Sequence, residues 1–481
     1  MIKELILALK NGIIEENKAW WTGMMTQREN IQIKLHSVTI EDLIPEDHFL
    51  RKLAALVDFS FIYDVVRDMY CHITGRPSIA PVVLVKYLLI GFLYGIESER
   101  RIEQEIRVNM AYRWFLGLDI GDPVPDHSTI SQNRRRRWGG ENIYRKLFER
   151  VLMICIEKGL VGGTLILTDS THVKANASKK TECRVMVEKE AAWYMERLDK
   201  YENRERERLE ELGRIKPKKE STKNSDTKEF VERTMSPSDL ESGRMNRPGK
   251  PEGMHYLDHQ SIDAKNGIIV DVAVTPGNAT DATPYLDRIE YMQEHIGLDI
   301  ESVGVDSAYD IGLVHQELSE KGIDLYTPVN DEKPRYKVEY QRGNFIYDQS
   351  EDAFFCPNGK ALTVRQLQRL EYGVYWEYRT DGKDCKGCPF REKCLSPSQK
   401  YRRIQVNIFE DAVKSNHIRD GTAEHKEILD LRQIWCEGTF AMQKARHNLR
   451  SLFRRGLEAA EDHCLLSATA INLKRMVKCV G

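Results

Sequence analysis

The chain of 481 residues has no excess of charge of either sign, because 72 lysines and arginines stand against 74 aspartates and glutamates for a net charge of −2. Nothing global therefore indicates an anionic partner, and a nucleic acid would have to be held by local basic patches. Internal repeats are also absent from the sequence. These absences leave an ordinary globular protein as the starting interpretation.

Long apolar runs are missing as well. The most apolar window, residues 82–96, contains Lys86 and falls short of the roughly 20 residues that span a bilayer, so a buried core helix is the better interpretation. The amino terminus carries Glu4, Glu15 and Glu16 and lacks the basic region, apolar core and cleavage site of a secretory signal. We therefore expect a cytoplasmic protein without a membrane partner. Its ten cysteines would be reduced, which makes clustered cysteines metal candidates before disulfides.

Length alone suggests about three domains, and the patterning predicts four kinds of region. Residues 1–160 read as a helical amino-terminal domain. An α/β core is divided among residues 161–177, 256–329 and 424–481. A charged helical insertion, residues 178–255, and a strand-rich insertion with clustered cysteines, residues 330–423, interrupt the core.

The helical part shows helix-like apolar spacing in residues 53–69, 80–95 and 101–116. A further helix is predicted to begin with Ser128 or Thr129 as its N-cap. It carries four consecutive arginines, Arg134, Arg135, Arg136 and Arg137. Successive helical residues point about 100° apart, so at least two of the four must meet solvent or phosphate. Two interpretations stay open: a helix-turn-helix-like DNA contact, or a solvated basic helix end favoured by the helix dipole.

From Thr164 the pattern changes to strands. The run 165–170 predicts a buried strand that delivers Asp169 near its carboxyl end. Asn266-Gly267 between two alternating runs predicts a hairpin with a type I′ turn. The remaining predicted elements are a helix 187–212, strands 259–264 and 268–275, a helix 281–295, a strand 300–306, a helix 311–321, a strand 324–329, strand-like pieces 336–347 and 374–379, and helices 424–449 and 459–477. This order predicts three antiparallel strands followed by parallel ones.

Three carboxylates are the main catalytic candidates. Asp169 and Asp306 each end an apolar strand, and Glu437 lies on a late helix. Phosphodiester cleavage needs an activated water or hydroxyl and a stabilised leaving oxygen, which two Mg²⁺ ions can supply. Mg²⁺ prefers oxygen ligands and keeps several waters, so two or three carboxylates suffice. The alternative is that each acid at a strand end is structural.

A basic strip follows Glu437. Lys444 stands seven residues later, so in a regular helix the two side chains share one face within about 20°. The segment from Lys444 to Arg455 contains no acid, and its basic residues are Lys444, Arg446, Arg450, Arg454 and Arg455. A carboxylate beside a row of cations suits a metal that holds a scissile phosphate while the cations hold its neighbours.

From about residue 48 to its end, the chain resembles the DDE transposases of bacterial insertion sequences. The resemblance rests on Gly75-Arg-Pro-Ser78, Ser98-Glu-Arg-Arg101, Ala111-Tyr-Arg-Trp-Phe115, Pro125-Asp-His-Ser128, Asp169-Ser-Thr-His-Val-Lys-Ala175, Asp306-Ser-Ala-Tyr-Asp310, Glu437-Gly-Thr-Phe440, Lys444 and Arg455-Gly-Leu457. It implies an α/β fold: a ribonuclease H-like mixed sheet with flanking helices, preceded by an all-α domain and split by two insertions.

The resemblance also implies a function. Asp169, Asp306 and Glu437 would bind two Mg²⁺ or Mn²⁺ ions, and Lys444 would contact DNA at the transposon end. The front domain and the basic strips would recognise terminal inverted repeats. The partners would be double-stranded DNA, both transposon ends and target, and further copies of the chain on that DNA, at the bacterial nucleoid. Two alternatives stay open: a metal-dependent nuclease without strand transfer, and a catalytically silent DNA-binding relic.

One branch of this family has a tyrosine and an arginine seven and four residues before the glutamate. In this chain those places hold Asp430 and Gln433, and Arg432 stands one position away from the expected arginine. We therefore do not expect the strand-handling steps of that branch to be copied in detail.

Four cysteines form a second candidate metal site. Cys385-Lys-Gly-Cys388 is followed by Cys394 and preceded by Cys356. A pair separated by two residues on a turn with glycine lets two thiolates reach one Zn²⁺, and four thiolates would close a structural site. Buried reduced cysteines, a redox pair and an iron–sulfur cluster are the alternatives.

Three histidines lie near the candidate stretches, namely His127, His172 and His447. A histidine beside a carboxylate can transfer a proton. Hydrogen-bonded structural roles are the alternative for each of them.

Overall fold

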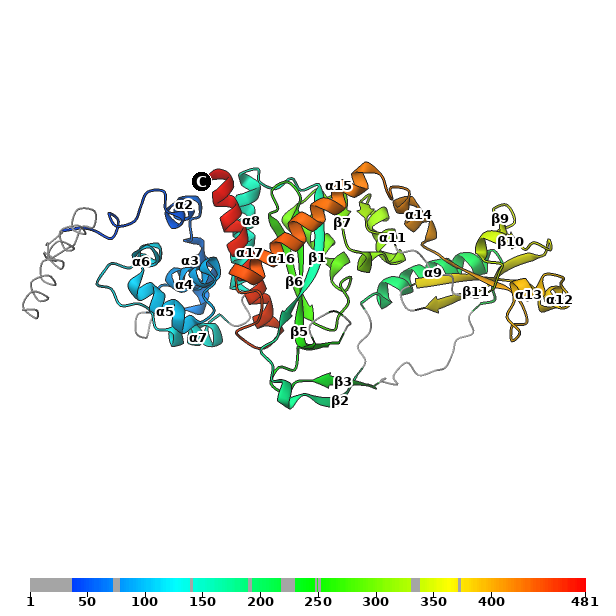
Figure 1. The fold of residues 1–481 in the computed structure, drawn as a ribbon, viewed down its shortest axis with the longest axis horizontal. Helices are drawn as coiled ribbons and strands as arrows, with labels where there is room; N and C mark the ends of the chain where they lie inside the picture. Colours follow the sequence, from blue (N-terminus) through cyan, green and yellow to red (C-terminus); the bar gives the residue numbers. More distant parts are fainter. Residues whose placement is uncertain are drawn as a thin grey trace, which may run out of the picture. The chain divides into compact units, whose positions relative to one another are not determined.

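The computed structural model describes residues 37–71, 78–138, 142–188, 193–217, 230–246, 249, 252–329, 338–370 and 373–481. Contacts divide the chain into two units, Met1–Pro45 and Glu46–Gly481. The elements below belong to the second unit (Figure 1).

The amino-terminal part of this unit is helical. Its helices are α2 (Phe49–Leu56), α3 (Phe61–Val66), α4 (Pro81–Tyr94), α5 (Glu99–Val108), α6 (Met110–Leu116), α7 (His127–Arg136) and α8 (Ile143–Glu157). The predicted helices 53–69 and 101–116 were each wrong in being continuous. Between α5 and α6 the side chain of Asn109 accepts a hydrogen bond from the Tyr112 amide, and this cap starts a new helix.

Helix α7 begins earlier than predicted. Its N-cap is Asp126, whose carboxylate accepts a hydrogen bond from the Ser128 amide at 2.8 Å, so the prediction of Ser128 or Thr129 as the cap was wrong. An aspartate caps as well as a serine does, and its charge also favours the positive end of the helix dipole.

The main sheet is mixed. Its strands are β1 (Leu165–Lys174), β4 (Gly243–Met245), β5 (Gly253–Asp263), β6 (Ile269–Pro276), β7 (Ser302–Gly304) and β8 (Asp324–Tyr326). The order is β4-β5-β1-β7-β8, and β6 pairs with β5. Strand β5 is antiparallel to β1 and β6, whereas β7 runs parallel to β1 and to β8. The predicted sequence of antiparallel and then parallel strands is therefore present, in a mixed α/β fold.

The β5–β6 hairpin is present, but its predicted type I′ turn was wrong. Only Gly267 has positive φ, at 71°, and Asn266 does not. The Asp263 carboxylate accepts a hydrogen bond from the Lys265 amide at 3.0 Å, and the Gly267 amide donates to the Asp263 carbonyl oxygen. The chain therefore reverses over a longer loop, in which one left-handed residue suffices.

Helix α17 (Leu457–Val480) joins the helical part to the sheet. It contacts α2, α4 and α8 as well as β5 and β6, and Figure 1 shows it beside α8 next to the sheet. Buried residues lie on nearly all of its sides, as expected for a helix enclosed by other elements. One continuous hydrophobic core therefore contains both helical and sheet residues.

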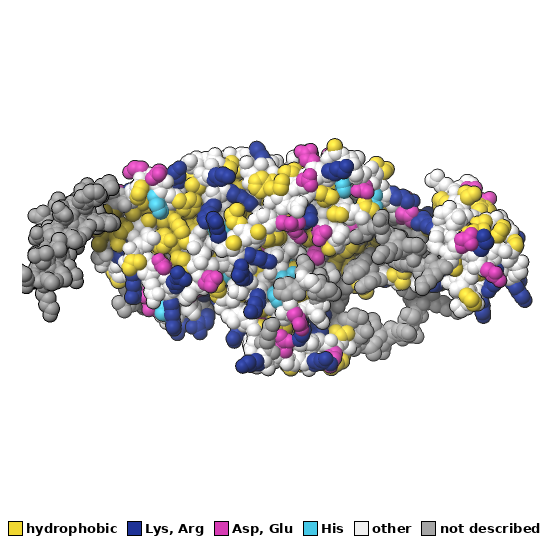
Figure 2. All heavy atoms as spheres, viewed as in Figure 1, with side chains coloured by type: hydrophobic (Ala, Val, Ile, Leu, Met, Phe, Trp, Pro, Cys, Tyr) yellow, Lys and Arg dark blue, Asp and Glu magenta, His cyan; other side chains and the backbone are white. Residues whose placement is uncertain are grey.

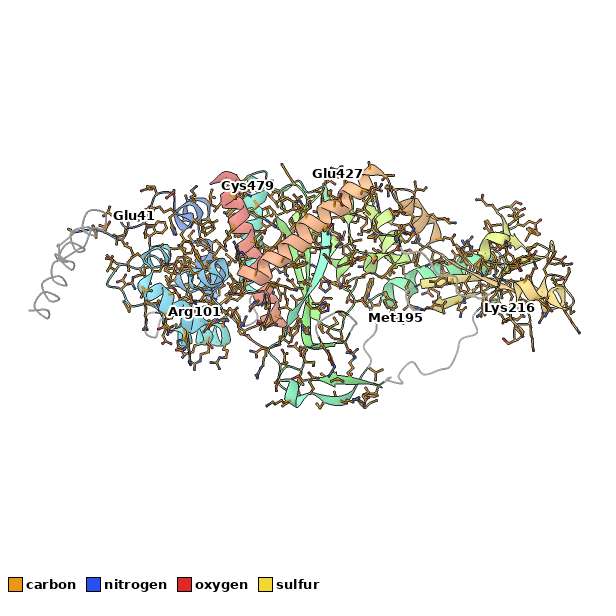
Figure 3. All side chains as sticks on the ribbon, viewed as in Figure 1. Glu41, Arg101, Met195, Lys216, Glu427 and Cys479 are labelled. Atoms are coloured by element: carbon orange, nitrogen blue, oxygen red, sulfur yellow. The ribbon has the colours of Figure 1, made fainter. Side chains whose placement is uncertain are left out.

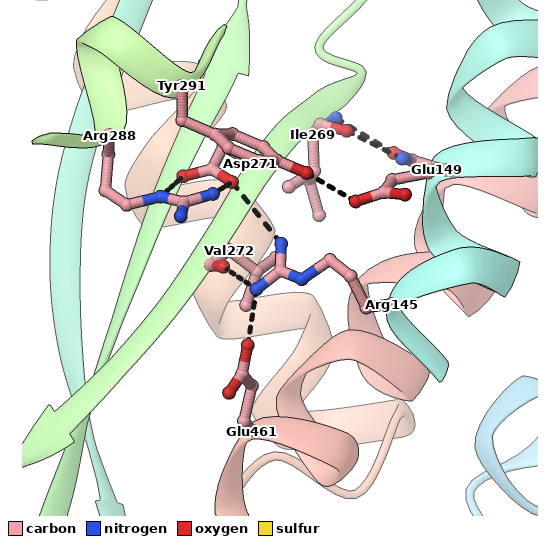
Figure 4. Close-up of polar contacts among 9 residues, drawn as sticks. Arg145, Glu149, Ile269, Asp271, Val272, Arg288, Tyr291 and Glu461 are labelled. Atoms are coloured by element: carbon pink, nitrogen blue, oxygen red, sulfur yellow. Dashed lines mark hydrogen bonds and ion pairs between the residues drawn. The ribbon is translucent and has the colours of Figure 1, made fainter. Parts of the chain in front are cut away.

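A polar network crosses this core (Figure 4). Asp271 of β6 has a side chain only 2% exposed, and it pairs with Arg145 of α8 and Arg288 of α10 (Tyr285–Tyr291). Arg145 also pairs with Glu461 of α17 at 2.6 Å. A buried carboxylate is tolerated only when it is paired in this way, so the network specifies how these elements meet.

The first insertion differs from its prediction. The predicted helix 187–212 is divided into strand β2 (Cys183–Glu188) and helix α9 (Met195–Glu211), and β2 pairs with β3 (Phe230–Met235). Figure 3 labels Met195, where α9 begins, and Lys216, just beyond its end. The basic Lys216-Pro-Lys-Lys219 segment lies partly outside the described residues.

The second insertion forms a separate antiparallel sheet, in the order β13-β12-β11-β10-β9. Its strands are β9 (Ile346–Asp348), β10 (Ala353–Phe355), β11 (Ala361–Leu370), β12 (Gly373–Arg379) and β13 (Arg403–Asn407), accompanied by short helices α12 (Gly382–Cys385) and α13 (Arg391–Cys394). This sheet has a small core of its own, which it shares with the end of α9.

The remaining helices and helical turns follow strands β6, β7 and β13. They are α10 with a π-helical turn η3 (Met292–Ile296), a 3₁₀ turn η4 (Ser307–Tyr309), α11 (Gly312–Glu320), α14 (Glu410–His417), α15 (Ala423–Arg432), a π-helical turn η6 (Gln433–Glu437) and α16 (Gly438–Arg446). The predicted helix 424–449 is therefore interrupted by a π turn. Among the described helices, no single one is long and apolar enough to cross a membrane, although α4 and α5 pass that test together as a bent pair.

Candidate active site

Asp169 and Asp306 lie just beyond the paired part of two neighbouring strands. Strands β1 and β7 are parallel, and their last pair is Leu167 with Gly304. Each aspartate stands two residues beyond this pair, and residues two apart on a strand lie on the same face. Both carboxylates therefore lie on one side of the sheet, where β7 ends. The prediction that the first strand ends near Asp169 was wrong, because β1 continues to Lys174 in its pairing with β5.

The backbone fixes Asp306. As the chain leaves β7, the Asp306 carboxylate accepts a hydrogen bond from the Ser307 amide at 2.6 Å and so caps η4. Its carbonyl oxygen accepts a hydrogen bond from the Thr327 hydroxyl at 3.1 Å. Asp310, four residues later, instead binds two histidines, so Asp306 is the acid of this motif that lies beside Asp169.

Close packing brings α15 onto this face of the sheet. A Cβ atom added at Gly304 would lie 2.7 Å from Ile428 of α15 and 2.9 Å from Leu167 of β1. Such separations are shorter than any real contact, so only glycine lets the helix approach this strand. The approach carries the turn with Glu437 to the strand ends.

Arg432 contacts two of the three carboxylates. Its Nη1 lies 2.8 Å from an Asp169 oxygen, and its Nη2 lies 3.9 Å from Glu437. In a regular α-helix, residues five apart would point about 140° away from each other. The π-helical turn η6 holds one extra residue, which returns Arg432 to the side of Glu437. This is how an arginine one position away in sequence reaches the site.

An aromatic anchor holds the π turn. Trp435 packs over the β5–β6 loop so closely that a Cβ added at Gly267 would lie 2.3 Å from its ring. Arg475 of α17 stacks on the same ring at 5.3 Å and donates to the Gly267 carbonyl oxygen and to the Thr439 hydroxyl. Burial lowers the pKa of Arg475 to about 10. The hairpin loop and α17 thus position the turn that carries Glu437.

Burial and nearby acids govern the charge of Asp169. Its side chain is 18% exposed. Burial raises the pKa of Asp169, Arg432 and the Ser170 amide oppose that rise, and the carboxylates of Asp306 and Asp281 add to it. The Asp169 site therefore holds several negative groups and one cation, Arg432, that pairs with it.

Asp281 is an acid near the site that sequence reasoning missed. It accepts a hydrogen bond from the Ser170 hydroxyl and is close enough to raise the pKa of Asp169. An acid at the start of a predicted helix reads as a helix-end residue, so no local signal distinguished it. Only the pairing of distant segments reveals that it lies near β1.

The basic strip after Glu437 is only partly exposed. The Lys444 ammonium group donates to the Thr171 hydroxyl of β1 at 2.6 Å. Arg454 pairs with Asp462 at 2.6 Å. Arg455 donates to the Asn176 carbonyl oxygen, but its side chain is exposed, as are those of Arg446 and Arg450. The arginines best placed to meet an outside anion are thus the three exposed ones.

The four consecutive arginines divide in the same way. Arg134 is largely enclosed beside Glu99, with a side chain 11% exposed. Arg135, Arg136 and Arg137 are exposed, although Arg137 stacks on Tyr70 at 4.7 Å. The prediction that the four could not all face the core is met, but one of the proposed DNA contacts, Arg134, is occupied within the protein. On the face drawn in Figure 2, basic side chains lie among acidic and hydrophobic ones.

The three candidate histidines have structural partners. His127 Nδ1 lies 2.9 Å from a Glu103 oxygen, and His447 Nδ1 lies 2.7 Å from the Phe92 carbonyl oxygen. The ring of His172 packs edge to face against His255 at 6.1 Å. None of these contacts involves the three candidate carboxylates, which favours the structural interpretation of each histidine.

Two clusters of described residues elsewhere have metal-ligating side chains within 4.8 Å of one another. The first consists of Asp310, His315 and His417. Both imidazole Nε2 atoms lie near one Asp310 oxygen, at 2.9 and 3.1 Å. The Asn416 side-chain amide donates a hydrogen bond to His315 Nδ1 at 3.1 Å, so the ring hydrogen is on Nε2, which donates to Asp310. Each group has a hydrogen-bond partner, and the cluster reads as a structural network that fixes α14 on α11.

A further group, Glu103, Asp126 and His127, joins α5 to the start of α7. Here the His127 amide also donates to Glu103 at 3.0 Å. Within the described part of the chain, the carboxylate oxygens of Asp169, Asp306 and Glu437 do not form a group whose atoms all lie within 4.8 Å of one another. The Arg432 guanidinium lies between two of them.

The carboxylates nevertheless fit divalent metal ions. The donor set is oxygen alone, which suits Mg²⁺ or Mn²⁺. The buried Asp169 carboxylate has a raised pKa, so a cation beside it would relieve the repulsion from its acidic neighbours. Asp306 is held rigidly by its cap, while Glu437, 54% exposed, keeps the freedom to turn toward a ligand.

Two family models match the chain. Residues 38–136 match the description "Transposase domain (DUF772)", and residues 355–477 match "Transposase DDE domain". The chain therefore contains two regions that match transposase domain families, and the resemblance predicted from its motifs is confirmed. The two matches are consistent with a DDE transposase of an insertion sequence. The second match contains Glu437, Lys444 and the four clustered cysteines.

Solved structures give weak similarities. A piggyBac transposase synaptic complex with hairpin DNA is 9% identical, with a TM-score of 0.35, over 90% of this chain and 75% of that one. A Mos1 transposase paired-end complex with the left transposon end is 11% identical, with a TM-score of 0.15, over 52% of this chain and 61% of that one. A Mos1 mariner paired-end complex with Mn is 9% identical, with a TM-score of 0.15, over 54% and 62%. No curated protein matches the chain.

Proposed function

We propose that this transposase binds the terminal inverted repeats of an insertion sequence and catalyses metal-dependent DNA cleavage and strand transfer. The observation that supports this most is the alignment of Asp169 and Asp306 on neighbouring parallel strands, with Arg432 linking Asp169 to Glu437. The two transposase domain matches add to it.

The proposal includes a domain organisation. Residues 1–160 form the DNA-binding part, and residues 161–177, 256–329 and 424–481 form a ribonuclease H-like catalytic core. Residues 178–255 and 330–423 are insertions, except that β4 and the start of β5, which fall within the first range, belong to the main sheet. Support for the core comes from the mixed sheet. Strand β5 runs antiparallel to both of its neighbours β1 and β6, whereas β1, β7 and β8 are parallel to one another.

In the proposed mechanism the three carboxylates hold the metals. Bound Mg²⁺ or Mn²⁺ ions would lower the pKa of the attacking water or 3′-hydroxyl and neutralise the leaving oxygen. Asp169 and Asp306 present their oxygens from a rigid sheet edge, which fixes the geometry of the site. Glu437 lies on the π turn η6 and approaches the two aspartates from the helix that packs over Gly304 of β7.

Arg432 has two roles in this mechanism. Without DNA, its guanidinium offsets the charge of Asp169 and Glu437. When the carboxylates have other cations, the same planar group matches the two oxygens of a phosphate. The exposed Arg446, Arg450 and Arg455 would extend the contact along the DNA backbone.

Asp306→Asn tests the assignment. Asparagine caps a turn about as well as aspartate, so the variant should fold, yet it has lost the ligand charge. We expect Mg²⁺-dependent cleavage of DNA carrying the element's own ends to disappear while end binding persists. The matched control is Asp58→Asn, an exposed aspartate whose carboxylate likewise accepts a hydrogen bond from a backbone amide, that of Ser60 at 2.8 Å. Cleavage by the Asp306 variant at the rate of the control would exclude the proposed site.

A second assay separates the alternatives. Pre-cleaved ends are incubated with a target plasmid and Mg²⁺. Joined products indicate a transposase that carries out strand transfer, cleavage without joining indicates a nuclease, and end binding without either reaction indicates a catalytically silent relic. Since phosphate contacts release counterions, end binding should weaken steeply with salt in the first and third cases.

A further inference from the structure

Four cysteines meet at one end of the second insertion. Cys356 follows strand β10, Cys385 ends α12, and Cys394 ends α13. Together with Cys388 they line one cavity of about 20 Å³. A cavity of this size holds about one water-sized sphere, so it has room for a single ion between the sulfur atoms and no room for a substrate.

Two tight turns present these sulfur atoms. In the Cys385-Lys-Gly-Cys388 turn, Gly387 has φ of 85°, and in the turn after Cys356, Gly359 has φ of 69°. Both backbones need the left-handed region that glycine supplies without strain. The Lys360 amide also donates to the Cys356 sulfur at 3.4 Å. This hydrogen bond fixes the position of the sulfur atom at the cavity.

A buried cation lies beside the cavity. Arg402 is buried, and it donates to the Cys394 carbonyl oxygen and to the Tyr340 carbonyl oxygen, each at 3.0 Å. A site with four thiolates and one Zn²⁺ carries a net charge of about −2, and the buried guanidinium would offset part of it.

The size of the local core gives a reason for a metal. The second insertion is packed around twelve buried side chains, two of which are Cys385 and Cys394. Cores this small rarely stabilise a sheet alone, and natural small domains commonly add a disulfide or a metal. All four cysteines are free of disulfides, so of these two reinforcements only a metal remains available to this core.

The sulfur atoms stand apart in the described structure. No three of them are among the described groups whose ligand atoms lie within 4.8 Å of one another. Closing a tetrahedral shell would therefore require small movements of the two glycine-containing turns and of α13. The alternative interpretation, four reduced thiols in a small core, leaves unexplained why Cys356 and Cys388, both only partly buried, face the same cavity.

We propose that Cys356, Cys385, Cys388 and Cys394 bind one Zn²⁺ in a closed, structural site. The metal links the β10–β11 turn to the α12–α13 segment and so replaces the missing hydrophobic core. Four protein ligands leave no open position for water, so the site takes no part in the strand chemistry. The proposal is independent of the carboxylate site, because it concerns different residues and a different metal.

Elemental analysis of the purified full-length protein tests the proposal. We expect one zinc per chain in the wild type and in Cys183→Ser, a matched control in which the mutated cysteine is exposed on β2. Cys388→Ser should lose at least 90% of that zinc. Wild-type protein that holds less than about a tenth of an equivalent after purification with added zinc would overturn the proposal, and so would full retention of zinc by Cys388→Ser.

A second measurement uses wild-type protein alone, in case the variant does not fold. Exchange of the metal for Co²⁺ should produce the intense near-ultraviolet sulfur-to-cobalt bands and the visible bands of a tetrahedral thiolate site. A chelator should then make four additional thiols reactive toward a thiol reagent. Iron in place of zinc, or a thiol count that the chelator does not change, would refute the proposal. Neither readout depends on DNA cleavage.

Discussion

Ile434 is the residue whose deletion best tests the π-helical turn. Its side chain is 61% exposed, so its removal loses little packing. A π turn holds one residue more than an α turn. Without Ile434, Arg432 and Glu437 would be four residues apart in a regular α-helix, where their side chains point about 40° apart. We therefore expect the deletion to keep Arg432 beside Asp169.

The opposite changes should break the contact. Insertion of one alanine after Ile434 would rotate Arg432 by about 100° relative to Glu437, and Arg432→Gln removes the charge directly. Breaking a buried ion pair costs about 3–5 kcal/mol. Asp169 keeps the Ser170 amide as a partner, so we expect a loss of about 2–4 kcal/mol for both changes, against less than about 1 kcal/mol for the deletion.

Urea denaturation of the four proteins measures these differences, since the midpoint shifts with stability at constant slope. DNA cleavage assays should rank the proteins in the same order. A deletion variant as unstable and as inactive as Arg432→Gln would refute the idea that the π turn acts as a one-residue correction of register.

Three further predictions follow from buried groups and from the surface. Burial lowers the pKa of His463 to about 4, below its unfolded value near 6.5, so this histidine is neutral when folded. Its contribution to stability is complete above about pH 6.5 and is lost as the pH falls toward 4, by up to about 3 kcal/mol. Thermal unfolding between pH 7.5 and 5 should show this loss, and His463→Gln should flatten the profile. Gly267→Ala should destabilise the protein by about 2–4 kcal/mol, because the left-handed φ and the indole contact both oppose a Cβ. In Gly297→Ala, where φ is 80° and the space is open, only the backbone cost of about 1–2 kcal/mol should appear in denaturation curves. Charge reversal of the exposed Arg135 and Arg136 together should weaken binding of the element's ends. If both residues contact phosphate, the slope of the logarithm of the binding constant against the logarithm of the salt concentration should become less steep by about 2. An unchanged slope would mean that both residues are only solvated.

Sequence patterns determined much of the fold. Short apolar runs predicted the strands that became β1, β7 and β8, because a buried strand needs such runs whatever surrounds it. Asn266-Gly267 predicted the hairpin. The pattern could not predict the type of turn, because that depends on the Asp263 carboxylate accepting a hydrogen bond from the Lys265 amide. The pattern also could not predict where the helix is interrupted. In the sequence Asn109 looks like any other polar residue of a helix, and only the structure shows that its side chain caps α6.

The acids of the candidate site were named from the sequence by their places at strand ends and by the resemblance. Their relation was decided by the tertiary structure, which pairs Leu167 with Gly304 across β1 and β7. Asp281 could not be found in this way. It approaches β1 only because α10 packs behind the sheet, and no local spacing records such a contact.

The basic residues show the same division most clearly. Helical geometry alone established that Arg134–Arg137 could not all be buried. That Arg134 is the least exposed of them depended on Glu99, which lies far away in the chain. Likewise Arg432 stood at the wrong spacing in the sequence, and the π turn brought it to Asp169. The periodicity of a sequence predicts which residues share a face of one helix or strand. It does not predict ion pairs or helix irregularities, because these depend on the distant residues that pack against that face.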